Sequence, residues 1–392
     1  MSEESPRKPA TSVAHLGRDP ARHIGAVNTP VYRATTILFN TVADLEAAER
    51  GEYHGLTYGL HGLPTVADLQ SAHATLEGAH AALAVPSGLA AITLALIGTV
   101  RAGDHVLVTD SVYGPTRRFC ANQLRRLGAE VSYYDPCVGE GIEREMRPNT
   151  RVVFTESPGS LSFEVQDIPA IAEVAHRHDA LVLMDNTWAT PLGFPAFAHG
   201  VDVSIHAGTK YLGGHSDVLI GLIGCTEATY PRLHRLWTDM GVAASSDDCF
   251  LALRGLRTLA VRLQRHTESA LAIAAWLEQR PEVDEVIFPA LPGSRGHELW
   301  KRDFTGACGL FGVVLKAVDK AGVDAMLDGM RLFKMGFSWG GFESLILPVR
   351  PERSRTATSW RAAGPYLRLH VGLEDCGDLI ADLAEGFARL RS

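Results

Sequence analysis

Residues 202–217 read DVSIHAGTKYLGGHSD, and this stretch decides how the rest of the chain is interpreted. Its first half is the kind of apolar run that forms a buried strand, and Lys210 stands directly after that run, just before a pair of glycines. Lysine is rarely buried without a function. Burial lowers the pKa of its amine and makes the amine nucleophilic. The stretch therefore predicts a strand whose carboxyl end presents a reactive lysine.

A reactive lysine of this kind is what a Schiff base with pyridoxal phosphate (PLP) requires, and the neighbouring sequence meets the other needs of this cofactor. Asp185 ends the apolar run LVLM, so an acid for the pyridine nitrogen is expected at a strand end, where α/β sheets bind ligands. Residues 86–91, PSGLAA, begin an apolar helix whose free N–H groups favour the phosphate. Thr209 offers a hydroxyl beside the lysine, and Tyr113 offers a ring for stacking. PLP is therefore the predicted cofactor.

Short apolar runs alternate with amphipathic segments of helix length between residues 63 and 225. Strands that are apolar on both faces and separated by helices indicate a mostly parallel sheet covered by helices. The predicted strands are 105–109, 131–134, 152–156, 181–185, 203–208 and 219–224. We therefore expect an α/β domain over residues 61–250 that binds the cofactor.

The sequence pattern changes near residue 250. One long helix is predicted over 251–279, with Pro281 just beyond its end. After it, the predicted strands are 285–288, 309–316, 345–347 and 367–371, and the predicted helices are 323–330 and 376–390. These patterns indicate a smaller α+β domain over residues 251–392.

Residues 1–60 are rich in Pro, Gly, Thr and Arg and show no sustained hydrophobic period. We expect an extended arm with one short helix at 42–50. Such an arm has little core of its own, so it is stable only when it wraps another part of the protein or a neighbouring subunit. The sequence therefore favours an oligomer.

The composition excludes several classes of protein. The chain has 392 residues, 46% of them hydrophobic and 21% charged, and its net charge is −8 without long blocks of like charge. This balance is typical of a globular protein and argues against nucleic acid as a partner. The six cysteines form no C-x-x-C pair, the N-terminus lacks an apolar signal segment, and the longest apolar run, 89–100, is too short to cross a bilayer. We expect a reduced, cytoplasmic chain with no membrane partner.

The histidines beside the lysine are weak candidates for a function. His206 and His215 flank it but have no metal-ligand spacing with cysteine or acidic residues. They are interpreted as core or rim histidines. No metal site is predicted.

Seven further motifs occur in order along the chain. They are VNTPVYR at 27–33, ESPGS at 156–160, MDNTW at 184–188, GLRT at 255–258, GHELWKRDF at 296–304, SWGGFES at 338–344 and LRLHVGLE at 367–374. Together with the lysine segment, they give the chain a resemblance to the cysteine/methionine-metabolism family of PLP-dependent enzymes over about residues 25–390. Within that family, the chain is most similar to the cystathionine β-lyase branch.

The resemblance implies an aspartate-aminotransferase-like fold, which is fold type I among PLP enzymes. It implies that Lys210 carries the cofactor, that Asp185 pairs with its pyridine nitrogen and that Tyr113 stacks on its ring. The phosphate ligands that it implies are Gly88, Leu89 and Thr209.

The resemblance also implies a substrate side and a second subunit. Arg368 is expected to clamp the α-carboxylate of an amino-acid substrate, a task suited to a planar two-pronged donor. Ser338 and Trp339 are expected beside the substrate. The family implies a homotetramer, a dimer of dimers with shared active sites, in which Tyr58 of a neighbouring subunit contacts the phosphate or the leaving group. The residues expected to act in catalysis are Lys210, Tyr113 and Tyr58.

One segment departs from the family pattern. Relatives carry an arginine two residues after that tyrosine, where it meets the phosphate in the partner subunit, and this chain has Leu60 there, within YGLHGLPT at 58–65. Leucine cannot replace a cation, and His61 points the other way in an extended segment. Loss of such a charge-assisted hydrogen bond costs on the order of 1.5–3 kcal/mol, unless another group substitutes for it.

The combined prediction is a PLP-dependent carbon–sulfur lyase that acts by β-elimination on cystathionine or a related sulfur amino acid, giving pyruvate, ammonia and a thiol. Trp339 matches the β-lyase form of its motif, whereas γ-acting relatives usually carry leucine there. Leu60 and His61 keep open γ-elimination, γ-replacement or carbon–carbon bond formation on a homoserine-, methionine- or sulfonium-type substrate. An inactive homologue that serves as a binding or scaffold protein is the alternative of another class, and the intact Asp185, Lys210 and Arg368 argue against it.

Overall fold

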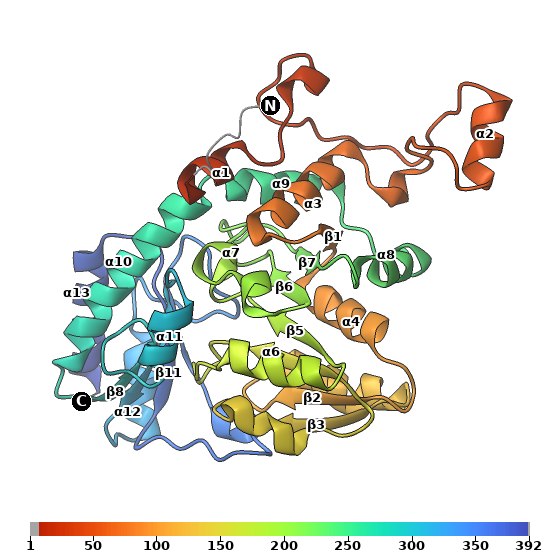
Figure 1. The fold of residues 1–392 in the computed structure, drawn as a ribbon. Helices are drawn as coiled ribbons and strands as arrows, with labels where there is room; N and C mark the ends of the chain where they lie inside the picture. Colours follow the sequence, from red (N-terminus) through yellow and green to blue (C-terminus); the bar gives the residue numbers. More distant parts are fainter. Residues whose placement is uncertain (1–7, 391–392) are drawn as a thin grey trace.

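Seven strands build the larger of two sheets, in the order β1-β7-β6-β5-β4-β2-β3 (Figure 1). The computed structural model describes residues 8–390, so residues 1–7 of the predicted arm lie outside the described residues. The strands are β1 (Ala81–Val85), β2 (His105–Thr109), β3 (Glu130–Tyr134), β4 (Thr150–Glu156), β5 (Leu181–Asp185), β6 (Val203–Ala207) and β7 (Gly221–Cys225). Strands β2 to β6 pair in parallel, whereas β7 is antiparallel to both of its neighbours, β1 and β6. The mostly parallel sheet is confirmed, and β1 is an edge strand that the sequence pattern did not reveal.

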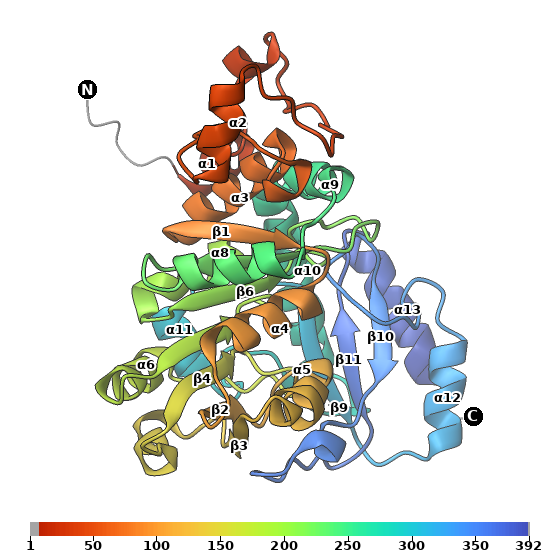
Figure 2. The same ribbon diagram turned by 90° about the vertical axis from the view of Figure 1, so that its right-hand side faces the viewer.

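Helices cover both faces of this sheet, which is why its central strands are apolar on both faces. Alternate residues of β5 enter different cores: Met184 packs in the core that includes α3 and α6, and Leu183 packs in the core that includes α4 and α8. Figure 2 shows α4 and α8 in front of the sheet. The covering helices are α3 (Pro64–Glu77), α4 (Gly88–Thr99), α5 (Gly114–Phe119), α6 (Ile168–Arg177) and α8 (Tyr230–Asp239). The first core and the second core therefore lie on opposite sides of each central strand.

Four antiparallel strands in the order β10-β11-β9-β8 form the second sheet. They are β8 (Val283–Ile287), β9 (Leu310–Leu315), β10 (Leu345–Pro348) and β11 (Tyr366–His370). Helices α12 (Lys320–Asp328) and α13 (Cys376–Arg389) lie beside this sheet, at the right of Figure 2. This architecture agrees with the expected smaller α+β unit, while the boundaries at residues 60 and 250 stay predictions.

The single helix predicted over 251–279 is wrong, because the chain forms two helices there, α9 (Ser246–Leu256) and α10 (Leu259–Glu278). The break follows Gly255, where a Cβ would lie 2.3 Å from the carbonyl oxygens of residues 212 and 213 in the lysine segment. Arg257 then donates hydrogen bonds to carbonyl oxygens of the arm, at 3.2 and 3.3 Å. These contacts join residues far apart in the chain, so the local hydrophobic period did not reveal the break.

The start of the arm packs on the body, whereas the part that carries α2 (Val42–Glu49) extends away from it at the upper right of Figure 1. The predicted helix of the arm is confirmed as α2, and α2 buries no residue. Large apolar side chains of the arm are exposed, with exposed fractions of 103% for Ile24, 83% for Leu38 and 71% for Val42. Within residues 8–60, the segment around α2 therefore has no core of its own.

The remaining elements are short. The α-helices are α1 (Pro9–His15), α7 (Thr190–Gly193) and α11 (His297–Asp303). The 3-10 turns are Pro20–His23, Gly59–His61, Gly139–Glu145, Ala196–His199 and Pro351–Ser354, and a π-helical turn at Cys120–Leu124 continues α5. Within residues 8–390, none of the helices combines the length and the apolar character that crossing a bilayer requires.

All six cysteines are free thiols, and four of them are buried. Burial raises the pKa of the buried thiols, for example to about 12 for Cys120. A thiol with such a pKa is a poor nucleophile at neutral pH. The buried cysteines therefore offer no alternative to the predicted lysine.

Candidate active site

Asp185 lies buried at the carboxyl end of β5, and Thr187 holds one of its oxygens. Oδ1 of Asp185 accepts hydrogen bonds from the Thr187 backbone N–H at 3.1 Å and from the Thr187 hydroxyl at 2.5 Å. That hydroxyl accepts from the N–H of Ala207 at 2.9 Å, at the end of β6. Burial raises the pKa of the Asp185 carboxyl, against the opposing effects of the Thr187 hydrogen bonds and the charges of His206 and Lys210. The carboxyl is therefore fixed between the ends of two parallel strands.

Lys210 follows β6 in a turn in which its N–H donates to the Ala207 carbonyl at 3.0 Å. Burial lowers the pKa of its amine to about 8, and the charge of Arg368 acts in the same direction, while Asp185 opposes both. The amine lies 5.5 Å from the centre of the Trp339 indole ring. The structure thus brings the lysine, the aspartate, the arginine and the tryptophan of the sequence prediction into one site.

Residues 338–341 of the smaller unit pack directly against the lysine. Ser338 and Gly340 both adopt left-handed backbone conformations, with φ of 81° and 85°. A Cβ on Gly340 would lie 3.0 Å from the carbonyl carbon of Lys210, so glycine permits this approach. The Gly340 N–H also donates to Nε2 of His370 at 3.0 Å. These contacts hold Trp339 beside the lysine amine.

Arg368 is a buried cation whose hydrogen-bonding capacity is only partly used. Its Nη2 donates to the Ser338 carbonyl at 2.9 Å, and its Nε has no hydrogen-bond partner within residues 8–390. Burial lowers the pKa of the guanidinium to about 10. An unpaired buried charge is costly, and a carboxylate matches the planar fork of arginine. The geometry therefore suits a carboxylate ligand at this position.

Two further titratable groups face Asp185. Glu156 is its partner across β4 and β5, and burial and the charge of Asp185 raise the pKa of Glu156 well above its usual range. Oε2 of Glu156 accepts a hydrogen bond from the Tyr113 backbone N–H at 2.7 Å. Burial and the charges of Asp185 and Glu156 raise the pKa of the Tyr113 phenol, although the residue as a whole is 42% exposed. The backbone of Tyr113 is thus tied to Glu156, while its side chain stays partly exposed.

The start of α4 supplies N–H groups for an anion. The Ser87 hydroxyl caps this helix by accepting from the Ala90 N–H at 3.1 Å. The N–H groups of Gly88 and Leu89 precede the first intrahelical hydrogen bond and point out of the helix start. A Cβ on Gly88 would lie 2.5 Å from the Cβ of Ala207, so glycine allows the helix start to reach the end of β6. The expected phosphate cradle therefore abuts the strand that leads to the lysine.

The groups collected at these strand ends fit PLP. The lysine amine of lowered pKa matches the aldehyde of the cofactor, and the buried aspartate matches its pyridine nitrogen. The helix N–H groups match the phosphate, and the buried guanidinium matches the carboxylate of an amino-acid substrate. A family profile described as Cys/Met metabolism PLP-dependent enzyme matches residues 10–388. This chain belongs to that family. PLP is accordingly its cofactor.

Individual members of the family are similar over their whole length. Cystathionine beta-lyase MetC of Escherichia coli K12 is 44% identical, over 98% of this chain and 99% of that protein. The L-alanine/L-glutamate racemase of Wolbachia pipientis is 40% identical, over 100% of this chain and 98% of that protein. The crystal structure of metB from Corynebacterium glutamicum superposes with a TM-score of 0.90 at 30% identity, covering 98% of both chains. The predicted fold of the family is therefore confirmed.

Tyr58 and Thr209 are placed differently from the other predicted site residues. Tyr58 lies in the arm, is 47% exposed, pairs with Thr36, and has its ring centre 6.2 Å from that of His61. The Thr209 hydroxyl donates to the carbonyl of Ile220 at 3.3 Å and accepts from the N–H of the same residue at 3.0 Å. A cofactor role for either residue stays a prediction.

Two residues of this site were not singled out by sequence reasoning. Glu156 ends a predicted strand, as Asp185 does, and that shared position was an available signal. Thr187 lies only two residues after Asp185 in the sequence. Its role in the site comes from its hydroxyl, which donates to Asp185 on β5 and accepts from the N–H of Ala207 on β6. That link depends on strand pairing, which the local sequence does not show.

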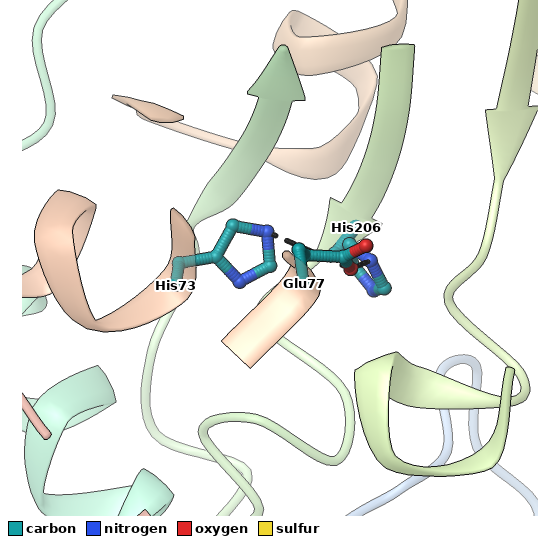
Figure 3. A group of neighbouring side chains, drawn as sticks. All are labelled: His73, Glu77 and His206. Atoms are coloured by element: carbon teal, nitrogen blue, oxygen red, sulfur yellow. Dashed lines mark ion pairs between the residues drawn. The ribbon is translucent and has the colours of Figure 1, made fainter. Parts of the chain in front are cut away.

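His206 is a buried core histidine, as predicted, and it has an acidic partner that the spacing along the sequence did not reveal. Glu77 of α3 contacts it, and His73 lies one helical turn before Glu77 (Figure 3). The candidate ligand atoms of the three buried side chains lie within 4.8 Å of one another. The i, i+4 spacing of His73 and Glu77 was visible in the sequence, but their contact with β6 was not.

Proposed function

We propose that the chain is a PLP-dependent carbon–sulfur lyase that removes the sulfur substituent from Cβ of cystathionine or a related amino acid. With water, cystathionine gives homocysteine, pyruvate and ammonia. The observation that carries the proposal is the partly buried Lys210 amine, which shares one site with Asp185, Arg368 and Trp339.

Lys210 is proposed to attach the cofactor and, once the amine of the substrate has displaced it, to remove the Cα proton of the substrate. With a pKa of about 8, about one amine in ten is unprotonated at pH 7, against about one in several thousand for an ordinary lysine. Nucleophile and base both need the unprotonated amine. The partial burial of this residue therefore serves both tasks.

Bound PLP supplies the electron sink that stabilises negative charge at Cα. Asp185 is proposed to hold a proton at the pyridine nitrogen, in the position that Thr187 fixes. Arg368 is proposed to orient the substrate by its α-carboxylate, using the Nε that has no partner within residues 8–390. Tyr113 is proposed to hold the aromatic ring of the cofactor, and Ser338 to hold Arg368 through its carbonyl.

Trp339 supports β- over γ-chemistry. The bulky indole beside the lysine amine narrows the space in which a substrate rotates to expose Cγ. The identity to a relative named cystathionine beta-lyase supports the same choice. Product analysis with cystathionine tests it: pyruvate and homocysteine are expected, and 2-oxobutyrate and cysteine as main products contradict the proposal.

The racemase relative defines a second test, because racemisation needs the same removal of the Cα proton. We expect L-alanine, which has no leaving group at Cβ, to be a poor substrate for net turnover. Chiral chromatography after incubation with L-alanine measures this directly. D-alanine formed faster than pyruvate is formed from cystathionine would replace the lyase by a racemase.

A homotetramer with shared sites is proposed for the assembly. The exposed apolar side chains of the arm support it, because a solvated arm of this kind gains stability only by packing on another surface. In such an assembly Tyr58 reaches the site of a neighbouring subunit. Sedimentation velocity of the purified protein tests the number of subunits.

A further inference from the structure

Residues 336–341 form a turn that packs on the lysine segment, where Gly340 approaches the backbone of Lys210. Within residues 8–390, this turn makes no backbone–backbone hydrogen bond. Its backbone is bound instead by two side chains of β11, those of Arg368 and His370. Residues two apart on a strand point to the same face. One face of β11 therefore holds the turn against the lysine.

His370 is the fully buried member of this pair. Nε2 of its ring lies 3.0 Å from the backbone nitrogen of Gly340 and 3.2 Å from the carbonyl oxygen of Gly341. Burial lowers the pKa of His370 to about 3, so the ring is neutral near pH 7. A neutral ring with its proton on Nδ1 accepts from Gly340, and one with its proton on Nε2 donates to Gly341. In either tautomer, the same nitrogen binds the turn.

Neighbouring groups fix the His370 ring from its other sides. Its Nδ1 lies 3.5 Å from the hydroxyl oxygen of Tyr211, and that oxygen accepts the N–H of Gly309 at 2.9 Å. The ring centre of His266 lies 5.3 Å from that of His370, and Nδ1 of His266 donates to the Val371 carbonyl at 2.8 Å. The two neighbouring rings are thus themselves bound to the backbone. The imidazole of His370 is therefore a rigid support for the turn.

The turn brings three groups to the site. The Trp339 ring centre lies 5.5 Å from the Lys210 amine, and the Ser338 carbonyl accepts from Nη2 of Arg368 at 2.9 Å. Ser338 has a left-handed backbone with φ of 81°, which a residue with a side chain keeps only when its surroundings enforce it. Because Arg368 is also the proposed carboxylate ligand, His370 is the support that does not depend on the substrate.

We propose that His370 is a positioning residue, whose ring keeps the 336–341 turn closed over the Lys210 amine and holds Trp339 and Ser338 beside the substrate. It acts through the backbone of residues 340 and 341, so it is not itself a catalytic residue. The identity of the substrate rests on the proposed function, whereas the geometry of the turn does not. Removal of the ring should therefore loosen the turn and let water reach the amine.

The first test is the pH dependence of Lys210 acetylation by acetic anhydride in the full-length protein after cofactor removal. Only the unprotonated amine reacts, so the midpoint of the rate profile reports the pKa of the amine. His370→Leu replaces the ring by a side chain that binds neither N–H nor C=O. The midpoint should then move from about 8 to about 9, toward that of an ordinary lysine. A midpoint that stays at about 8 in the folded variant overturns the proposal.

His370→Gln and His370→Asn form a matched pair, because both carry the same amide and differ by one methylene group. Glutamine extends its amide to about the position of Nε2 and offers both an acceptor and a donor, so it should retain the wild-type midpoint. Asparagine is too short to reach the turn and should behave as His370→Leu does. If His370→Leu does not fold, this pair decides alone. A His370→Gln midpoint that moves as far as that of His370→Asn overturns the proposal.

His105→Leu is the control for loss of a buried histidine. His105 begins β2, and its ring nitrogens lie 2.8 and 3.0 Å from the hydroxyl oxygens of Thr150 and Ser132, at the amino end of the sheet. Its replacement removes a comparable set of hydrogen bonds but leaves the turn in place. The Lys210 midpoint of this variant should therefore match that of the wild type. Circular dichroism and thermal melting verify that each variant is folded.

Steady-state kinetics of the holoenzyme give the second readout. In His370→Leu, Arg368 loses the carbonyl that orients it, so KM for cystathionine should rise about tenfold. At pH 9 much of the amine is unprotonated in both proteins, so kcat should change by less than about threefold. A fall in kcat at pH 9 with an unchanged KM contradicts the positioning role.

The two readouts separate this inference from the proposed function. Acetylation of Lys210 requires no turnover, so it tests the turn whatever the substrate is. If the wild type does not convert cystathionine, the lyase proposal fails and the acetylation profiles still decide the role of His370. If the wild type is active while folded His370→Leu keeps both the midpoint and the KM, the positioning role alone is overturned.

Discussion

The strand ends that carry Asp185 and Lys210 differ from the arm that carries Tyr58 in what fixes their side chains. Asp185 is 8% exposed and tied by Thr187 to a second strand. Tyr58 is 47% exposed and stands in an arm whose large apolar residues face solvent. Pairing and burial within one chain therefore fix the first region, whereas assembly with other chains is expected to fix the second.

The largest effect is expected at the strand ends, for Lys210→Ala. Loss of the amine removes both the covalent attachment and the base, so turnover of cystathionine should fall by at least about 1000-fold. The visible absorption of the bound cofactor should change as well. A coupled assay for pyruvate measures the rate. Lys301→Ala, an exposed lysine on α11, serves as the control and should retain wild-type turnover.

A loss of at least about tenfold is expected when the arm is prevented from packing on a neighbour. Leu38→Asp combined with Val42→Asp places charges on exposed apolar positions, so the oligomer should dissociate and turnover should fall. Leu127→Asp, at a position on the body that is 55% exposed, is the matched control and should change neither. Sedimentation velocity and the pyruvate assay are the measurements. A fully assembled and active arm variant would show that the arm makes no essential contact.

The pH dependence of Lys210 labelling measures the pKa of its amine and so tests whether burial at the strand end lowers that pKa. Only the unprotonated amine reacts with acetic anhydride, so the labelling rate in cofactor-free protein should rise with pH and level off above about 8, the pKa that burial produces. A free lysine derivative in the same solution, with a pKa of about 10.4, should continue to rise. Mass spectrometry of the labelled peptides gives both rates. A Lys210 profile that follows the free derivative would contradict the burial effect.

The smallest effect is expected at the arm, for Leu60→Arg. This change restores the cation that relatives use at the phosphate of a partner subunit, and a partly solvated charge-assisted hydrogen bond should tighten PLP binding about threefold to tenfold. Leu60→Met is the control of similar size without charge. Equal or weaker binding by the arginine variant indicates that another group occupies the space, and the altered segment then serves substrate recognition.

Much of the fold follows from local sequence pattern. The runs at 105–109 and 181–185 are strands with those bounds, because a strand that is apolar on both faces leaves a continuous signature in the sequence. The helix break after Gly255 left no such signature, since it depends on carbonyl groups of the lysine segment. Edge strand β1 was missed although Ala81–Val85 is also a continuous apolar run, because its three alanines are equally typical of a helix.

The local sequence specifies which chemical groups the site contains and on which kind of element each stands, because a lysine or an aspartate at the end of an apolar run is a local pattern. Three features of the site follow instead from how the chain folds: Thr187 links Asp185 to β6, Arg368 has an Nε without a partner within residues 8–390, and Glu77 contacts His206. Each of these depends on strand register and helix packing between segments tens to hundreds of residues apart. Such contacts are set by the burial of whole faces, and no local period records them.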